Sequence, residues 1–451
     1  MVTYPGKKEN GKGWVIGKIP LDTSAIPQSL LNIENKDRSN LFPWNGQFSP
    51  QFVEALLDAY APPDASVLDP FAGSGTVLYE AGRKRLRAIA SEINPAAYAM
   101  ASTYRLINLD PQRRTQIVSQ LDEILHRAFP ERLPLFYSTP DQSEDDIKQA
   151  LIGLALNQED RSSRLLLEAM IVLLDFYQAG LSAEKLMTMW KRLKLLVHSL
   201  PYSDRVLDVY NCDARALPVK DESVDLVITS PPYINVFNYH QQYRASAEAL
   251  GWEMLTIARS EIGSNRKHRG NRFLTVIQYC LDVAQVLSRL SSVMKSTGRL
   301  IFVVGRESRV RGVPFFNGEI AGLLGTRCAG FELKTRQERV FKNRFGELIY
   351  EDILHFMHPV RVEADSLSSA REVAGEILAG ARKIATDKVM PDILSAMDQL
   401  HKVEPSPIYE AAKAYDSGKL KRRKDDHINH VRQLLVNEAP VEKNVLELGY
   451  F

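Results

Sequence analysis

The amino-acid sequence predicts an α/β fold whose sheet is parallel at first and ends in an antiparallel hairpin, with a helical insertion and a helical C-terminal region. Three observations predict it. A strand, a glycine-rich turn and a helix follow one another after residue 65, and a second strand covers 87–93. Residues 111–200 keep the apolar spacing of helices. Strands and helices then alternate from residue 205 to a hairpin over 336–357.

Caps and periodicity justify the elements one by one. Ser49 offers an N-cap and Pro50 a first helical residue, so a helix is expected from here to the prolines at 62 and 63. The two strands after it flank a helix, and strands joined in this way are parallel. Further strands are expected at 205–214, 223–229 and 298–305, with a long helix over 273–294.

These elements divide the chain into four parts. Residues 1–40 lack steady periodicity and are expected to form a loosely ordered arm. Residues 41–110 and 201–360 form the main domain. Residues 111–200 interrupt it with roughly three or four helices, which are a candidate target-recognition region. Residues 361–451 are expected to be a helical, charged C-terminal region.

Composition narrows the classes of protein. The chain has 451 residues, 45% of them hydrophobic and 25% charged, as in globular proteins. Its net charge is only +2, so attraction to nucleic acid must come from local basic clusters. The three cysteines form no CxxC pair, and no metal site is expected. No apolar run resembles a signal peptide or spans a bilayer, so we expect a cytoplasmic protein with no membrane role.

The segment VLDPFAGSGT at 67–76 is the first with chemical content. Gly73 and Gly75 in a strand-to-helix turn allow a ligand to approach the backbone at a helix N-terminus. The segment matches neither the dinucleotide GxGxxG pattern nor a phosphate-binding P-loop. Glu92, at the end of the next strand, could accept hydrogen bonds from ribose hydroxyls, or it could be a surface acid. Asp213 could accept from an adenine amino group, or it could form an Asx-turn.

The segment DLVITSPPY at 225–233 is the most informative. Its two prolines cannot continue a sheet, so they fix an extended backbone at the carboxyl end of an apolar strand, where ligands bind in open α/β sheets. An exocyclic amino group needs hydrogen-bond acceptors and a methyl donor in line, and no charged nucleophile. The Ser230 hydroxyl and the Pro231 carbonyl are the expected acceptors, and Tyr233 is expected to stack on a base.

Together, DPFAGSGT and TSPPY resemble the cofactor-binding and catalytic motifs of the DNA amino-methyltransferases, the N4-cytosine and N6-adenine enzymes. The segment FPWNGQFSP at 42–50 resembles the one that precedes the cofactor turn in this family. The resemblance covers about 41–110 and 205–358, with the cofactor motif first, so the chain is not a permuted member. It implies a Rossmann-like methyltransferase sheet and S-adenosyl-L-methionine as cofactor, with the catalytic domain formed by 41–110 and 201–360.

The resemblance also implies roles for individual residues. The implied catalytic residues are Ser230, Pro231, Pro232 and Tyr233. The implied cofactor-binding residues are Phe42, Trp44, Asp69, Pro70, Phe71, Gly73, Gly75, Thr76, Glu92, Ile93, Asp213 and Ala214.

In this family the residue before the two prolines is usually Asp or Asn for adenine and often Ser for cytosine. Ser230 therefore favours methylation of cytosine N4, with adenine N6 as the alternative. Two other interpretations stay open: a methyltransferase of RNA or of a protein amide, and a nucleic-acid-binding subunit without catalysis. Double-stranded DNA is the expected partner, and a cognate restriction endonuclease is a candidate partner.

The target base must be flipped out of the duplex to reach such a site. The segment after the motif is rich in aromatic and amide groups that could complete a base pocket, and a basic loop at 259–272 could contact phosphates or merely be solvated. The expected DNA-binding residues are Asn235, Tyr239, Arg266, Lys267, Arg269 and Arg272. The basic cluster KLKRRK at 419–424 is a weaker candidate, because Asp425 and Asp426 reduce its charge.

Overall fold

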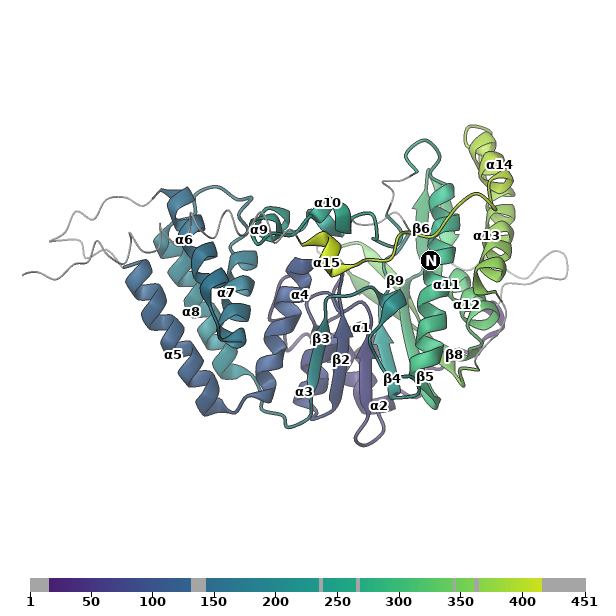
Figure 1. The fold of residues 1–451 in the computed structure, drawn as a ribbon. Coiled ribbons are helices and arrows are strands. Elements are labelled where there is room, and N and C mark those ends of the chain that lie inside the picture. Colours follow the sequence, from purple (N-terminus) through teal and green to yellow (C-terminus); the bar gives the residue numbers. More distant parts are fainter. Residues whose placement is uncertain are drawn as a thin grey trace, which may run out of the picture.

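The structure is a computed structural model that describes residues 16–130, 143–234, 238–264, 268–343, 346–360 and 365–415. Its centre is a seven-stranded sheet in the order β3-β2-β1-β4-β5-β9-β8 (Figure 1). The first five strands are parallel, and β9 pairs antiparallel with both β5 and β8. The predicted α/β sheet with its closing hairpin is thereby confirmed. The strands are β1 Ser66–Asp69, β2 Arg87–Ser91, β3 Leu207–Tyr210, β4 Val224–Thr229, β5 Met294–Gly305, β8 Glu332–Lys342 and β9 Leu348–Met357.

Helices cover both faces of the sheet, because alternate residues of its buried strands are apolar on each side. Val67, Leu226 and Val303 share one core with the helices α2 to α4, while Leu68 and Phe302 share the other with α11 to α14. A small hairpin of β6 Glu307–Val310 and β7 Val313–Phe316 follows β5. The helices of the two layers are α2 Pro50–Tyr60, α3 Thr76–Arg83 and α4 Pro95–Ser102, and α11 Leu274–Val293, α12 Asn317–Cys328, α13 Ser366–Arg382 and α14 Met390–Asp398.

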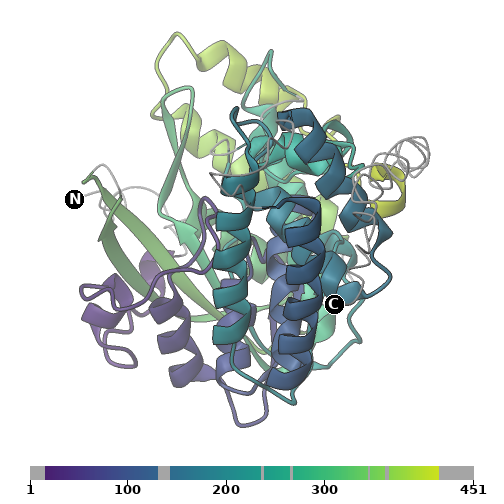
Figure 2. The same cartoon turned by 90° about the vertical axis from the view of Figure 1, so that its left-hand side faces the viewer.

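The segment 111–200 holds four helices among its described residues: α5 Pro111–Ala128, α6 Glu144–Asn157, α7 Arg161–Leu173 and α8 Ala183–Ser199. Each begins after a side chain that caps its first turn, and these caps are Asp110, Ser143, Asp160 and Ser182. The helices lie side by side next to α4 (Figure 2). Their buried side chains, Trp190 included, continue the core of α2 to α4, so the insertion extends the core beside the sheet instead of forming a separate one.

Within the N-terminal arm expected for 1–40, the described residues from 16 onward contact the sheet. Residues 16–32 include a short 3-10 helix, Ile16–Lys18, and α1, Gln28–Asn32. The Asp22 amide donates to the Arg336 carbonyl over 2.8 Å, and the Asn32 side chain accepts from the Val340 amide over 2.9 Å. These contacts satisfy backbone groups of the edge strand β8 that would otherwise lack partners in the sheet. These contacts involve backbone groups, so the spacing of apolar residues in the sequence could not predict them.

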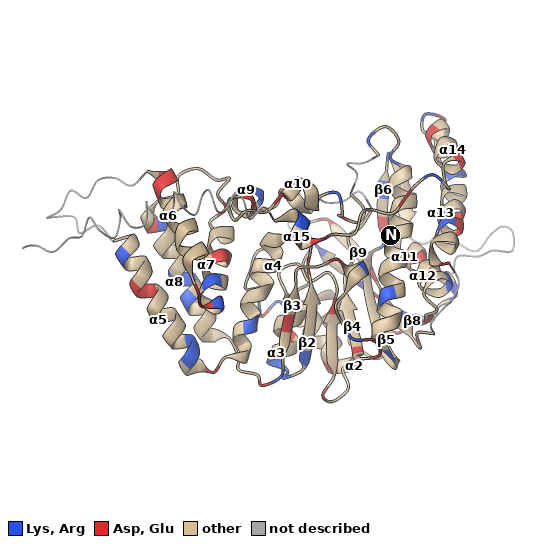
Figure 3. Ribbon diagram, in the orientation of Figure 1, with Lys and Arg blue, Asp and Glu red and all other residues tan. Residues whose placement is uncertain are grey.

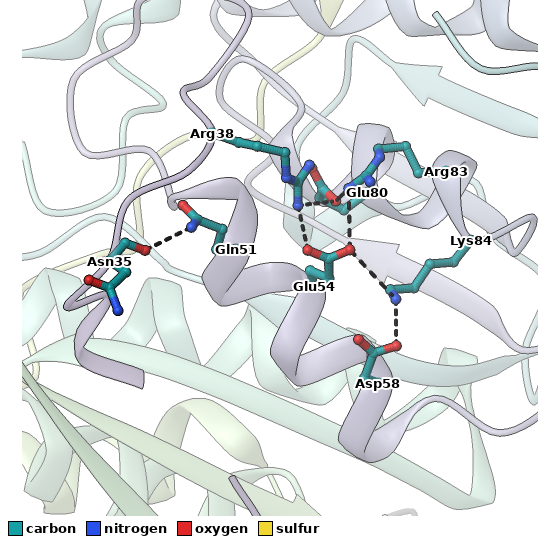
Figure 4. A network of polar contacts seen from close by, with 8 residues as sticks. All are labelled: Asn35, Arg38, Gln51, Glu54, Asp58, Glu80, Arg83 and Lys84. Carbon is teal, nitrogen blue, oxygen red and sulfur yellow. Dashed lines mark hydrogen bonds and ion pairs between the residues drawn. The ribbon is translucent and has the colours of Figure 1, made fainter. Parts of the chain in front are cut away.

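A second anchor joins the N-terminal segment to α2 and α3 through charges (Figure 4). The Arg38 guanidinium donates to Glu80 over 2.7 Å and to Glu54 over 2.6 Å, and Arg83 donates to the other Glu80 oxygen over 2.6 Å. The Glu80 side chain is fully buried, so its charge depends on these two guanidinium groups.

The C-terminal region is helical only in part. Helices α13 and α14 pack beside α11 and α12, but residues 399–410 are not helical and cross the carboxyl ends of the strands before the short α15, Ala411–Ala414 (Figure 1). The basic cluster 419–424 lies outside the described residues. Among the described helices, none has the length and apolar character needed to cross a membrane.

Replacing Glu80 by Gln should lower the free energy of unfolding by about 1–3 kcal/mol, because it leaves two guanidinium groups facing a neutral amide. Urea unfolding of the two proteins measures this. Asp58→Asn is the matched control: the Asp58 carboxylate contacts Lys84 in the same cluster but is 61% exposed. Its loss should change stability by less than about 0.5 kcal/mol, and an equal effect of both substitutions would contradict the burial argument.

Candidate active site

One pocket lies at the carboxyl ends of β1, β2 and β4, where the sheet is open. About 910 Å³ of space, part of it open to solvent, lies between its lining residues. Seven stretches of the chain, between residues 44 and 262, line it. Its lining includes Trp44, Gln47, Asp69, Pro70, Phe71, Gly73, Thr76, Glu92, Ile93, Asp213, Ala214, Ser230, Pro232, Tyr239, Ser260, Glu261 and Ile262.

The turn after β1 needs glycine at two positions. Gly73 has φ +51°, and a Cβ there would stand 2.9 Å from Cδ1 of Trp44, so only glycine lets the indole lie against the turn. Gly75 has φ +89°, and a Cβ there would stand 3.0 Å from the Ala101 backbone of α4. Gly75 therefore does not line the pocket. It allows α3 and α4 to pack closely behind it.

Two carboxylates stand at the floor of the pocket, Asp69 buried and Glu92 half-buried. Asp69 accepts hydrogen bonds from the Thr229 hydroxyl over 2.7 Å and the Phe71 amide over 3.1 Å. Glu92 accepts from the amides of Asn94, over 2.8 Å, and Gly73, over 2.9 Å. Burial raises the pKa of each to about 7, against the hydrogen bonds, and the nearby charge of Asp69 raises the pKa of Glu92 further.

Asp213 lines the pocket, but its carboxylate is already saturated. Oδ1 accepts from the Arg215 amide over 3.0 Å and Nε over 2.8 Å, and Oδ2 accepts from Arg215 Nη2 over 2.7 Å and the Tyr409 amide over 2.9 Å. A carboxylate offers about four lone-pair sites, and all four are filled. The side chain holds Arg215 and the chain near Tyr409, and its expected contact with the cofactor's adenine stays a prediction.

The Ser-Pro-Pro-Tyr segment divides between the pocket and its surroundings. Ser230 and Pro232 line the pocket, whereas Pro231 is buried outside the lining. The Tyr233 hydroxyl lies 3.2 Å from Ser230 Oγ, within hydrogen-bonding distance, and burial raises the pKa of Tyr233. Its ring lies 3.1 Å from where a Cβ would stand at Gly305, at the end of β5. The ring and Ser230 thus form one rigid unit.

Aromatic side chains line the pocket beside the turn. Trp44 stacks between Tyr239 and Tyr243, with ring centroids 6.2 and 6.4 Å apart. Tyr239 was expected to contact DNA, but the structure places it in the pocket lining beside the cofactor residues. Phe42 was expected to bind the cofactor, yet it lies in the core against Tyr104 at 5.5 Å. Both corrections have one cause: Trp44 alone of the two early aromatics reaches the turn.

Residues 260–262 form a wall of the pocket that the sequence did not indicate. Glu261 accepts from the His240 amide over 2.6 Å and lies 2.7 Å from His240 Nδ1. Both residues are buried, so this pair fixes the segment that carries Tyr239. Gln47 also lines the pocket, where its side chain accepts from the Ser74 hydroxyl. A lone Glu in a polar loop carries no local signal, since its partner lies 21 residues away.

The expected DNA-contacting loop follows this wall. Arg269 is exposed and Arg272 half-buried, whereas Asn235, Arg266 and Lys267 lie outside the described residues. Lys and Arg are interspersed with Asp and Glu along the ribbon, in keeping with the small net charge (Figure 3). The basic loop is therefore a local feature of the pocket side.

Comparison with known proteins supports the first half of the site. Residues 3–103 match the family model of N6 and N4 methyltransferases, described as DNA methylase. This match includes the segments 42–50 and 67–76 and Glu92, and it ends before the Ser-Pro-Pro-Tyr segment. No match was found among curated proteins.

Solved structures give distant likenesses. A SAM-dependent methyltransferase from Methanosarcina mazei is 12% identical, with 68% of this chain and 98% of that chain covered and a TM-score of 0.31. An rRNA methyltransferase from Streptomyces viridochromogenes is 13% identical, with 80% and 99% covered and a TM-score of 0.28. A geranyl diphosphate C-methyltransferase from Streptomyces coelicolor is 9% identical, with 71% and 84% covered and a TM-score of 0.27.

The residues of the pocket fit the cofactor that the family implies. Asp69, Glu92 and Glu261 complement the sulfonium and ammonium charges of S-adenosylmethionine, and Phe71 and Ile93 offer apolar surface to its adenine. Residues 3–103 are thus similar to the N6/N4 DNA methylase family.

Proposed function

We propose that this protein transfers a methyl group from S-adenosylmethionine to the exocyclic N4 amino group of cytosine in DNA. One observation carries the proposal: Ser230 and Pro232 line the same pocket as Asp69, Gly73 and Glu92. The acceptors for an amino group therefore adjoin the residues that would hold the methyl donor.

The cofactor supplies the activated methyl group, and the protein's own residues position the amine. Ser230 Oγ, which lines the pocket, would accept an amino hydrogen and help to point the nitrogen lone pair at the methyl carbon. The N–C bond forms as the S–C bond breaks, and the proton leaves the nitrogen to solvent. The Tyr233 ring would stack on the flipped base, held in place by Gly305 and Ser230.

The choice of cytosine rests on Ser230, as the resemblance implies, and adenine N6 is the second candidate. The neutral hydroxyl of Ser230 already lies 3.2 Å from the Tyr233 hydroxyl, so it can accept one hydrogen from the base amine while Tyr233 donates to it. A carboxylate at this position would carry a charge next to the buried Tyr233.

The direct test is transfer of labelled methyl groups from S-adenosylmethionine to unmethylated bacterial DNA, followed by mass spectrometry of the nucleosides. N4-methylcytosine is the expected product. N6-methyladenine would keep the chemistry and overturn the assignment of the base. Label in RNA alone, or cofactor binding with no transfer to any nucleic acid, would contradict the DNA methyltransferase.

Replacing Tyr233 by Ala should reduce methyl transfer by about 5- to 150-fold, the range that loss of base–aromatic stacking predicts, while cofactor binding stays nearly intact. Tyr233→Phe is the matched control, because it keeps the ring and removes only the hydroxyl near Ser230. Single-turnover rates and the dissociation constant of the cofactor measure both effects. An equal loss of cofactor binding would show that the segment is only structural.

Cofactor affinity should increase as pH rises from 6 to 8. Asp69 and Glu92 have raised pKa values of about 7, so at pH 6 each carboxyl group is protonated in most molecules. Each must lose its proton before its negative charge can attract the cationic cofactor. The affinity is therefore low below pH 7, and each group that must ionise contributes a change of about tenfold. Calorimetric titration across this range measures it. Glu92→Gln should weaken binding at pH 8 and flatten the slope, whereas a pH-independent affinity of the unmodified protein would refute the linkage.

A further inference from the structure

The chain after α14 contacts the wall of the pocket. We define residues 399–415 as the C-terminal strap; it runs from α14 across the carboxyl ends of the strands to α15, beside α10, Met254–Ile257 (Figure 1). The strap lies about 200 residues after β3 in the sequence, yet it reaches the loop that follows β3. None of the motifs that identify the site lies within it.

Arg215 holds the strap against the sheet, and every N–H group of its side chain donates a hydrogen bond. Besides its bonds to Asp213, its guanidinium donates to the Asp282 carboxylate of α11 over 3.0 Å. It also donates to two strap carbonyls, Ser406 over 2.7 Å and Pro407 over 2.9 Å. Five N–H groups are thereby used, in a place where the Arg215 side chain is 1% exposed.

Asp282 completes the anchor from the other side. It accepts from the Ser406 amide over 2.8 Å and from the Ser406 hydroxyl over 2.5 Å. Burial raises the pKa of Asp282 to about 6, and the charge of Arg215 opposes that rise. With its polar groups satisfied inside the protein, the strap at Ser406 is held as firmly as an element of the core.

Tyr409 connects the anchored strap to the pocket through hydrogen bonds. Its hydroxyl donates to Asn211 Oδ1 over 2.5 Å, and Asn211 Nδ2 donates to the carbonyls of Glu92, over 2.8 Å, and Ile93, over 3.2 Å. Its amide donates to Asp213. Tyr409 is 5% exposed, so these bonds do not compete with bulk water. A hydrogen-bonded chain thus runs from the strap to the backbone of two pocket-lining residues.

We propose that the part of the C-terminal strap anchored at Ser406 and Tyr409 supports the cofactor site and that Tyr409 is a positioning residue for the adenosine half of the cofactor. Tyr409 does not line the pocket; it acts through Asn211, which fixes the ends of β2 and β3 around the ribose and adenine positions. The inference rests on the proposed cofactor-dependent function. It also explains why the Asp213 carboxylate is occupied: its role is to hold the strap in place.

The test is Tyr409→Phe in the full-length protein, which removes one hydroxyl and keeps the ring. Loss of a buried hydrogen bond predicts a dissociation constant for S-adenosylmethionine about 2- to 12-fold higher. The maximal methyl-transfer rate at saturating cofactor should stay unchanged, since Tyr409 does not touch the reacting groups. The melting temperature is measured in parallel. Tyr415→Phe, at the end of the strap beside Trp252, is the matched control and should leave the dissociation constant unchanged.

A double-substitution cycle makes the route specific. Asn211→Ala alone should weaken cofactor binding, and adding Tyr409→Phe should weaken it no further, because both changes break the same chain. An unchanged dissociation constant in Tyr409→Phe would overturn the inference. So would equal weakening by Tyr415→Phe, which would give the strap a merely structural role. Failure of the unmodified protein to bind S-adenosylmethionine at all would instead refute the proposed function.

Discussion

The join between the ends of β1 and β2 is the constraint on which the whole site depends. The Gly73 amide donates to Glu92, the Ala72 amide to the Ser91 carbonyl over 3.0 Å, and the Ser91 hydroxyl to the Pro70 carbonyl over 2.8 Å. These bonds require a backbone that turns sharply without a side chain at Gly73, since any Cβ there would collide with Trp44. The turn therefore fixes the floor of the pocket and its aromatic wall at once.

Without a bound cation, ionisation of the two carboxyl groups at the floor of the pocket is unfavourable. Asp69 and Glu92 line the same pocket, and desolvation opposes the ionisation of both. A cationic ligand relieves this cost, so the same burial that destabilises the empty floor favours binding of a sulfonium compound. An adenosine compound without positive charge would gain less from these two groups.

The rest of the pocket comes from segments that meet only in the folded chain. Trp44 stacks on Tyr239 and Tyr243, so the segment before the cofactor turn and the segment after the Ser-Pro-Pro-Tyr motif form one wall. Glu261 fixes that wall through His240, and the C-terminal strap fixes the opposite one through Arg215 and Tyr409. Cofactor site and amine site are consequently built on shared supports.

The sequence by itself determined the parallel sheet, its closing hairpin, the glycine-rich turn and the segment of Ser230. Each is written in neighbouring residues, as apolar periodicity, turn chemistry or two adjacent prolines. Only the tertiary structure decided that Asp213 binds Arg215 and the strap, that Tyr239 lines the pocket, that Phe42 lies in the core and that residues 16–32 cover an edge strand. These outcomes depend on hydrogen-bond and packing partners that lie far apart in the sequence. Asp213 and Tyr409, for example, are separated by 196 residues. Local sequence patterns cannot predict such partners.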